Sequence, residues 1–541
     1  MKALTMGTWA TALSLAGFAA TQTPSAPLFS GKTSRPPLSQ QVPTAPLQKG
    51  VLSVASPIVI RSADGAPAAA TFRVRYSGPL GAHLEVRGSG AVQAVGTAAA
   101  ISATSFDATV HSTASTVAGP HDGIVQLRMC FDQACNKVVR GTEISVPAKV
   151  LVDWVAVDDW GTFQRDSGHT GYVPVTLQPA RFALKWSWQR SAGTGTRINS
   201  VATEAGRVFV SDDDYFGTPL LRALDEANGS LLWEQAFPEA PALNPPAAVD
   251  GRVYITTSGH EKTALWAFAS TDGTPLMQSG FPSQWPHYLA PTVKNNRAYT
   301  NGGYYGGGVY AFDADLGDPL WAKEAGDDDM ATPAVDDEYA YYYSGTALYQ
   351  YAADTGETTA IVPDPYFPAQ GYSYHAAPVL GSPDHVIAFS GGAFSGMASA
   401  STEQYESRWL VDFAPATESV RWRTARAYLT QPAVAHGVVY AASNNPKSFD
   451  ALDEATGTRL WSWVPGTADT AFHRNIVVTD NLAFVSTDVA VYAIDLASHK
   501  AVWSYPVPGM LAMSGRGTLY IVEGARSTTG RLIAIDLRRP Q

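Results

Sequence analysis

The residues of this sequence that first invite a catalytic interpretation are aspartates that recur at regular intervals. A carboxylate can act as a general acid or base, or it can bind a cation. Each of these aspartates, however, has the same place in a repeated stretch, of which Ala451–Trp461 is the clearest copy. A residue type repeated in every copy indicates turn building rather than catalysis. The aspartates are Asp225, Asp313, Asp453, Asp495 and Asp536.

Two further groups of carboxylates are runs, Asp212–Asp214 and Asp327–Asp329. Clustered oxygens could bind calcium, which prefers several oxygen ligands. Neither run has the alternating Asp-x-Asp-x-Asp spacing of a calcium-binding loop, and they lie three repeats apart, so one shared ion is not expected. We favour solvated charge, with metal binding as the alternative, and predict no metal site.

The only two cysteines, Cys130 and Cys135, are separated by four residues. This spacing suits a hairpin loop whose flanking strands bring the sulfurs within bonding distance. Zinc would need further ligands nearby, and the sequence offers none. We predict a disulfide, provided that the chain is exported, with two free thiols as the alternative.

The first residues indicate export. Met1–Ala20 has one lysine followed by a stretch rich in Leu, Ala and Phe, which is typical of a secretory signal peptide. No later run reaches the ~18 apolar residues of a membrane helix, and no cysteine follows directly for lipid attachment. Residues 21–50 carry six prolines and predict an extended linker. We expect a periplasmic or extracellular protein without an anchor.

Residues 51–152 alternate apolar and polar side chains in short segments such as Ala70–Tyr76 and Ile124–Cys130. About seven strands in roughly a hundred residues are typical of an immunoglobulin-like β-sandwich. The two cysteines would then close one hairpin rather than bridge two sheets. A passive spacer is the favoured role for this module, and adhesion is the alternative.

The stretch Ala451–Trp461 predicts a strand, a tight turn and a returning strand. Asp453 can bond the local backbone, Gly457 permits a positive φ, and Trp461 lies on the returning strand. Copies of its Ala recur about every 44 residues, which predicts an array of eight four-stranded blades, an all-β propeller. The anchors lie at 223, 267, 311, ~350, ~412, 451, 493 and 534.

The segment 182–188 predicts a strand without an upstream partner, and it is similar to the last strand of later repeats, such as 460–463. The final repeat ends at Asp536 without a last strand of its own. We therefore expect 182–188 to complete the final sheet and close the ring, which leaves no long open edge. The predicted propeller spans residues 159–541.

These repeats resemble the PQQ-like (pyrroloquinoline-quinone-type) β-propeller family over roughly residues 159–541, lead-in segment included. The resemblance implies that each repeat's tryptophan docks between neighbouring blades. The structural residues it assigns, beyond the aspartates above, are Gly229, Trp233, Gly317, Trp321, Gly457, Trp461 and Trp503.

The family includes quinone-dependent dehydrogenases and outer-membrane assembly lipoproteins. The dehydrogenases use a vicinal disulfide, a calcium ion and a catalytic aspartate; the propeller here has no cysteine, and the calcium ligands cannot be assigned position by position. The lipoproteins begin with a lipidated cysteine and carry no sandwich module. No cofactor is therefore predicted, with PQQ and calcium as the alternative.

The resemblance also implies that loops joining blades, and loops between second and third strands, gather on one face. Aromatic and basic side chains around such a funnel mouth suit a sugar ring or a peptide strand, although they could simply pave the opening. The residues concerned are Tyr288, Tyr374, His375, Tyr428, His473 and Arg474.

No nucleophile with a neighbouring base can be assigned, so no catalytic residue is predicted. A net charge of −11 argues against nucleic acid as a partner. We expect an exported, non-catalytic binding or scaffold protein with a protein or glycan partner. The alternatives are a PQQ-dependent oxidoreductase with a degenerate site and a factor for outer-membrane protein assembly.

Overall fold

The computed structural model describes residues 49–538 apart from short internal segments. The predicted signal peptide (1–20) and nearly all of the linker (21–50) lie outside the described residues. The internal segments left out are 64, 116–118, 155–156, 191–196, 214–216, 261, 284–288, 303–306, 326–327, 368–372, 375–376, 392–407 and 524–529.

The described elements are strands, with two short 3-10 turns, η1 (Pro179–Arg181) and η2 (Pro415–Thr417), which confirms the all-β class. None of the described helical segments is long and apolar enough to cross a membrane.

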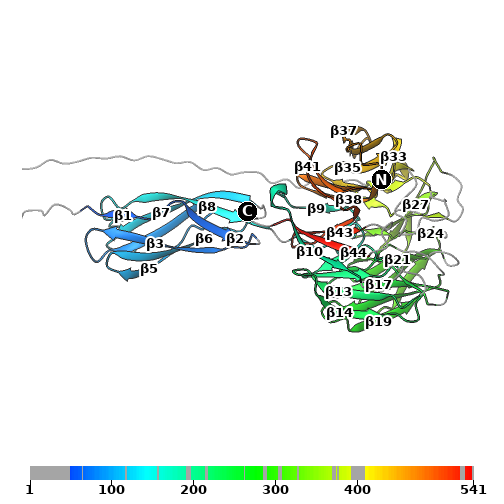
Figure 1. Ribbon diagram of the computed structural model, residues 1–541, viewed down its shortest axis with the longest axis horizontal. Coiled ribbons are helices and arrows are strands. Elements are labelled where there is room, and N and C mark those ends of the chain that lie inside the picture. Colours follow the sequence, from blue (N-terminus) through cyan, green and yellow to red (C-terminus); the bar gives the residue numbers. More distant parts are fainter. Residues whose placement is uncertain are drawn as a thin grey trace, which may run out of the picture. The chain divides into compact units, whose positions relative to one another are not determined.

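Residues 51–152 form two four-stranded sheets around one hydrophobic core (Figure 1). Alternate side chains such as Val74, Val125 and Val150 are buried between the sheets, because successive residues of a strand point to opposite faces. The first sheet has the order β1 (Val51–Ser53), β3 (Ala69–Ser77), β6 (Ser105–His111), β5 (Thr97–Ser102). The second has the order β2 (Ile58–Ser62), β8 (Ile144–Val152), β7 (Gly119–Cys130), β4 (His83–Gly90). The immunoglobulin-like assignment stays a prediction.

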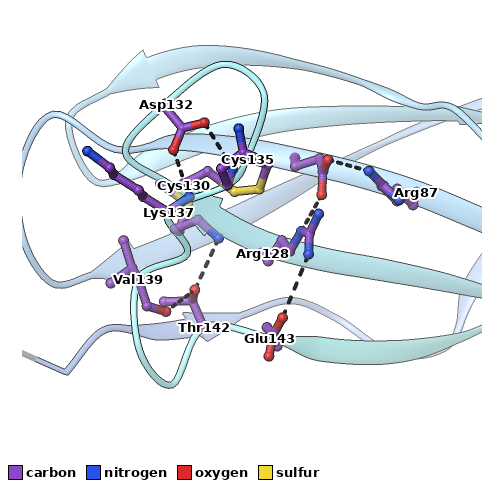
Figure 2. The surroundings of a disulfide bond; sticks show 12 residues. Arg87, Arg128, Cys130, Asp132, Cys135, Lys137, Val139, Thr142 and Glu143 are labelled. Carbon is purple, nitrogen blue, oxygen red and sulfur yellow. Dashed lines mark hydrogen bonds and ion pairs between the residues drawn. A yellow bond between two sulfur atoms is a disulfide. The ribbon is translucent and has the colours of Figure 1, made fainter. Parts of the chain in front are cut away.

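The disulfide between Cys130 and Cys135 is present, at the end of β7 (Figure 2). The two Cα atoms are 5.1 Å apart, within the usual range for this bond. Inside the loop, the Asp132 carboxylate accepts the backbone N–H groups of Asn136 at 2.9 Å and Lys137 at 2.7 Å. A covalent bond and a side-chain cap therefore hold the same short loop.

From residue 183 onward the chain forms antiparallel sheets of four strands, the architecture of propeller blades (Figure 1). Sheet I consists of β11 (Ala202–Glu204), β12 (Arg207–Ser211), β13 (Leu220–Asp225) and β14 (Leu231–Ala236), and sheet II of β16 (Ala247–Val249), β17 (Arg252–Ser258), β18 (Ala264–Ala269) and β19 (Pro275–Gly280). Sheet III consists of β20 (Thr292–Lys294), β21 (Arg297–Gly302), β22 (Gly308–Asp313) and β23 (Pro319–Lys323), and sheet IV of β25 (Ala334–Val335), β26 (Tyr339–Tyr343), β27 (Ala347–Ala352) and β28 (Thr358–Pro363).

Four further sheets follow. Sheet V consists of β30 (Val379–Leu380), β31 (Val386–Phe389), β32 (Arg408–Ala414) and β33 (Ser419–Tyr428), and sheet VI of β34 (Ala433–Ala435), β35 (Val438–Asn444), β36 (Lys447–Asp453) and β37 (Arg459–Trp463). Sheet VII consists of β38 (Phe472–Thr479), β39 (Leu482–Thr487), β40 (Val491–Asp495) and β41 (Lys500–Tyr505), and sheet VIII of β42 (Gly509–Met513), β43 (Thr518–Glu523), β44 (Arg531–Asp536) and β10 (Ala183–Gln189). Short strands β15 (Ala242–Leu243) and β9 (Tyr172–Val173) extend sheets II and VII, and β24 (Asp328–Asp329) pairs with β29 (Ser373–Tyr374). The blade count of the whole chain stays a prediction.

Strand β10 pairs antiparallel with β44, from Ala183 opposite Asp536 to Gln189 opposite Arg531. Sheet VIII thus joins the beginning and the end of this part of the chain. The second strands are buried on both faces, as in β39, because each sheet packs between two others. The fourth strands alternate, as in β14, because they form the outer edge.

Tryptophans link successive sheets. The indole Nε1 of Trp233 in sheet I donates to Ser270 O in sheet II at 3.1 Å, and Trp321 donates to Ala353 O at 3.1 Å. The ring lies over a glycine of the next sheet: a Cβ at Gly273, whose φ is +74°, would sit 2.7 Å from Trp233. Trp186 and Trp422 make the same contact with Gly229 and Gly457.

Two of the assigned tryptophans deviate from this arrangement. Trp461 stacks instead on the imidazole of His499, with ring centroids 4.4 Å apart, because His499 takes the glycine position with φ 57°. Trp503 packs against Phe182 at 5.4 Å.

The repeated aspartates are the last residues of the third strands, and all but Asp536 precede the turn into the fourth strand. The carboxylates accept backbone N–H groups two or three residues further on, for example Ala227 N on Asp225 and Thr456 N on Asp453. The same bond forms at Asp313, Asp495 and Asp536.

Because the strands of each sheet alternate in direction, their connections fall on two faces. We call the face with the first-to-second and third-to-fourth strand turns the turn face. The opposite face, which carries the second-to-third strand loops and the connections between sheets, is the loop face.

Candidate functional site

The lead-in segment 157–177 fills the axis around which the sheets are arranged, and we call it the axial plug. Backbone N–H groups near the first strands of sheets I, II, IV, V, VI and VII donate to plug carbonyls. The donors are Thr203, Ala248, Val335, Leu380, Val434 and Val478, at 2.6–2.8 Å from the acceptors. The first strand of a blade has no neighbour on its inner side, so the plug satisfies backbone groups that would otherwise be unpaired.

The two remaining sheets are also bonded to the plug. Thr162 Oγ1 donates to Pro291 O beside sheet III at 2.6 Å, and Gly515 N in sheet VIII donates to Asp159 Oδ1 at 2.9 Å. Asp159 also accepts Ala205 N in the first turn of sheet I, which places this part of the plug toward the turn face. One segment of about twenty residues thus contacts each of sheets I to VIII.

The backbone of the plug is strained. Gln164, Arg165 and His169 have φ values of 52°, 84° and 59°, in the left-handed region that side chains disfavour. Such conformations persist where surrounding contacts over-determine them. Here the contacts are the hydrogen bonds to all of the sheets.

Two buried side chains of the plug join distant sheets. Gln164 Nε2 donates to Pro432 O at 3.1 Å, and its Oε1 accepts Asn475 Nδ2 at 2.7 Å. The His169 imidazole contacts Pro378 O through Nδ1 and Thr292 Oγ1 through Nε2, both at 2.9 Å. Since a carbonyl can only accept, Nδ1 carries the proton and Nε2 accepts from threonine.

The described residues leave little space on the axis. The cavity beside Phe163, Gln164, Asn475 and Met510 has a volume of about 10 Å³, which is about the space of one water molecule. This cavity beside the plug therefore has no room for a small ligand.

Two of the predicted funnel-mouth residues, Tyr428 and His473, are buried in the structure. Tyr428 is 1% exposed, and its hydroxyl donates to Asp450 Oδ2 at 2.9 Å, so it does not form an exposed aromatic surface. Burial, reinforced by the Asp450 carboxylate, raises the pKa of Tyr428 far above its usual value. His473 is also buried, at 5% exposure. Tyr288 and His375 lie outside the described residues, and the side chains of Tyr374 and Arg474 are not described.

The expectation of solvated charge is wrong for Asp212. Its side chain is fully buried, and it pairs with Arg222 at 2.6 Å and Arg190 at 3.1 Å. Two guanidinium groups and the N–H of Leu220 replace the water that this carboxylate loses. Asp214 and Asp327 lie outside the described residues, and the side chains of Asp328 and Asp329 are not described.

Sequence reasoning missed a buried acid–base pair. Asp412 Oδ2 lies 2.8 Å from His385 Nδ1, and Arg421 lies 3.8 Å away. Burial raises the pKa of Asp412 to about 7, and the two basic groups oppose this rise. The carboxylate is wholly buried, so no substrate reaches it from solvent. In the sequence, the only indication of this pair was that Asp412 lies at the weakly matching repeat anchor near residue 412.

The described residues do not fit a quinone cofactor with calcium. Both cysteines lie in the sandwich and bond each other, so the propeller has no vicinal disulfide. In the described part of the propeller, no three His, Cys, Asp or Glu side chains lie close enough to share an ion; the one such group, Glu85 with Cys130 and Cys135, uses its sulfurs in the disulfide.

Comparison with known proteins gives partial matches. A family model described as outer membrane protein assembly factor BamB matches residues 183–285 and 390–539. The dehydrogenase subunit of the quinone alcohol dehydrogenase of Gluconobacter oxydans (strain 621H) is 33% identical over 121 residues, which cover 20% of this chain and only 16% of that protein. The repeated four-stranded sheets have the architecture of a β-propeller, and these partial matches support a propeller of the PQQ-like type.

Two solved structures are similar at 13% identity. BamB from Moraxella catarrhalis has a TM-score of 0.45 and covers 66% of this chain and 99% of its own. The quinohemoprotein alcohol dehydrogenase ADHIIG from Pseudomonas putida HK5 has a TM-score of 0.40, with 71% of this chain and 81% of its own covered.

Proposed function

We propose that this chain is an exported scaffold protein whose propeller binds a partner protein on the loop face without catalysing a reaction. The observation that carries the proposal is the axial plug, which bonds to each of sheets I to VIII and has beside it a cavity of only about 10 Å³. A rigid ring with a filled axis suits a partner large enough to contact several loops at once.

Of the two partner classes that the sequence allows, the match to the BamB family model favours a protein over a glycan. The disulfide in the sandwich is compatible with an oxidising compartment, in line with the signal-like Met1–Ala20.

The test is affinity capture from an envelope fraction with the full chain as bait. Val464 and Val489 are 62% and 41% exposed on the loop face, and Leu316 is 71% exposed on the turn face. Val464→Glu with Val489→Glu should weaken capture of the specific partner at least tenfold, and Leu316→Glu should leave it unchanged. Equal loss with both variants, or no specific partner, contradicts the proposal.

The alternative enzyme function rests on the match to the quinone alcohol dehydrogenase. It is tested by adding PQQ and calcium and then measuring dye reduction with alcohols and sugars. Saturable cofactor binding together with turnover would replace the scaffold proposal. A role in outer-membrane protein assembly would show as recovery of outer-membrane assembly proteins in the same capture.

A further inference from the structure

The cleft between sheets I and II contains a pocket of about 620 Å³, close to the loop face. This volume lies in the range of roughly 300–1,000 Å³ that ligand pockets usually have. Its lining is apolar and aromatic at the base and polar at the mouth. The residues that matter here are Gln235, Phe237, Lys262, Thr263, Trp266 and Gln278.

The aromatic base of the pocket is held in a fixed orientation. Trp266 Nε1 donates to Thr257 Oγ1 at 3.2 Å, and the Trp266 ring meets Phe237 edge to face at 5.5 Å. Phe268 lies parallel to Trp266 with ring centroids 6.3 Å apart. Trp266 remains partly exposed, so an ordered indole face is available without rearrangement.

Two other clefts between sheets show that an indole ring can occupy this space. In the fourth strands, Trp233 pairs with Ala223 and Trp461 pairs with Ala451, so Gln235 and Trp463, two residues later, are equivalent. In the third strands of the following sheets, Trp266 precedes Ala267 as Tyr492 precedes Ala493. Between sheets VI and VII, Trp463 fills the cleft against Tyr492, with centroids 5.2 Å apart.

The cleft between sheets VIII and I is filled in the same way. Trp188, the equivalent of Gln235, lies under the guanidinium of Arg222, the equivalent of Trp266, at 5.7 Å. Between sheets I and II the smaller Gln235 replaces the ring, and its Nε2 is held by Gly273 O at 2.9 Å. The space that an indole takes in two other clefts is therefore open here.

We propose that this pocket binds an aromatic side chain, a tryptophan above all, presented by the partner protein. The incoming ring takes the place that Trp463 takes between sheets VI and VII and packs against Trp266 and Phe237. The exposed ion pair of Glu239 and Lys262, 2.9 Å apart, lies at the mouth and supplies groups for the backbone of the bound segment. This inference rests on the proposed protein-binding function and names the chemistry of the partner.

The test uses N-acetyl-tryptophanamide as the probe and the full chain as the receptor. Saturation-transfer NMR should show saturable binding with a dissociation constant on the order of 1 mM, as expected for one small anchor. Gln235→Trp, which supplies the missing ring in cis, should weaken probe binding at least tenfold. The matched control Lys323→Trp, at the equivalent position of sheet III, should leave it unchanged.

A second measurement keeps the inference testable if Gln235→Trp fails to fold. Photo-labelling of the unmodified chain with a diazirine-bearing indole should mark peptides that contain Phe237 or Trp266. Binding that does not saturate below about 10 mM, labelling elsewhere, or equal loss in both variants overturns the proposal.

Partner capture separates this inference from the proposed function. Gln235→Trp should reduce capture of the specific partner as well as probe binding. Probe binding in the pocket with undiminished capture would mean that the pocket does not receive the partner's side chain, which overturns the inference but not the scaffold function. Absence of any specific partner overturns the scaffold function itself.

Discussion

At the scale of single residues, His169 shows how a buried polar group is used here for assembly. Its two ring nitrogens bond Pro378 O beside sheet V and Thr292 in sheet III, so one side chain of the plug ties two sheets together. Burial lowers the pKa of His169 to about 4, so the imidazole is neutral at physiological pH. A charged ring would lose the hydrogen bond that Nε2 accepts.

The depressed pKa of His169 predicts loss of stability in acid. Between pH 6.5 and about 4 the unfolded chain binds a proton at this site that the folded chain does not, so its contribution is complete above pH 6.5 and falls as the pH falls. Urea unfolding at pH 7.5, 5.5 and 4.5 should show that His169→Gln loses less stability than the unmodified chain, by up to about 3 kcal/mol.

His169→Gln must be compared with the unmodified chain because Asp412 changes the pH dependence of stability in the opposite direction. Its pKa is raised to about 7, so protonation in the same pH range favours the folded state. Equal pH slopes in the two proteins would contradict the role of His169.

At the scale of elements, the contact of a tryptophan with a glycine of the next sheet is the repeated joint. Gly273 and Gly251 both have positive φ, +74° and +78°, but an added Cβ meets Trp233 at 2.7 Å at the first and nothing within 4 Å at the second. Alanine substitutions at these two glycines therefore separate the free-energy cost of a positive φ from the cost of the clash with Trp233.

Gly251→Ala should cost about 1 kcal/mol, the usual penalty for a side chain at positive φ. Gly273→Ala should cost about 2 kcal/mol more, because the methyl group displaces the Trp233 ring. Chemical denaturation of the two variants measures the difference. Similar costs at both positions would show that the indole contact adds nothing.

The disulfide loop is a second element with a measurable contribution. Replacing both Cys130 and Cys135 by alanine should cost about 2 kcal/mol locally, the value expected for a short closed loop. Hydrogen exchange should rise mainly in residues 131–142, and the Asp132 contacts limit the effect to this loop. Unchanged exchange there, or an equal rise in the propeller, would contradict this.

At the scale of the whole molecule, the plug and the β10–β44 pairing connect parts of the chain that lie far apart in sequence. Trp186 on β10 donates to Glu226 O in sheet I at 2.9 Å, so sheet VIII is joined to sheet I by the same contact that joins sheet I to sheet II. The plug then adds one bonded segment common to sheets I to VIII. Such shared contacts predict cooperative unfolding of the propeller.

Gln164→Ala should therefore destabilise the propeller as a unit. The change leaves Asn475 Nδ2 and two buried carbonyls without Gln164, at a cost of about 2–3 kcal/mol. Calorimetry should show one propeller transition at a lower temperature. The exposed Gln278→Ala is the matched control and should change stability by no more than about 0.5 kcal/mol. Sheets that melt separately would contradict the shared role of the plug.

Much of the fold could be predicted because its signals are local. The turn at Asp453 and Gly457 depends on side-chain-to-backbone bonds within a few residues, and the recurrence of the same stretch predicts a repeated sheet. The residues of the candidate site were harder to predict from the sequence, because the burial of a loop residue depends on segments far away in the chain. Tyr428 and His473 are polar residues near strand ends, and nothing in their neighbours signals that other sheets cover them.

The repeated aspartates, which first suggested catalysis, show where this boundary lies. The sequence by itself determined the all-β class, the period and the residues of each turn, since these follow from backbone preferences and nearby hydrogen bonds. Only the tertiary structure decided that the lead-in segment fills the axis and that Asp212 is a buried ion pair. It also decided that the cleft beside Gln235 stays open. These features arise from contacts between sheets, and they differ between copies of the same repeat because the neighbouring side chains differ in size.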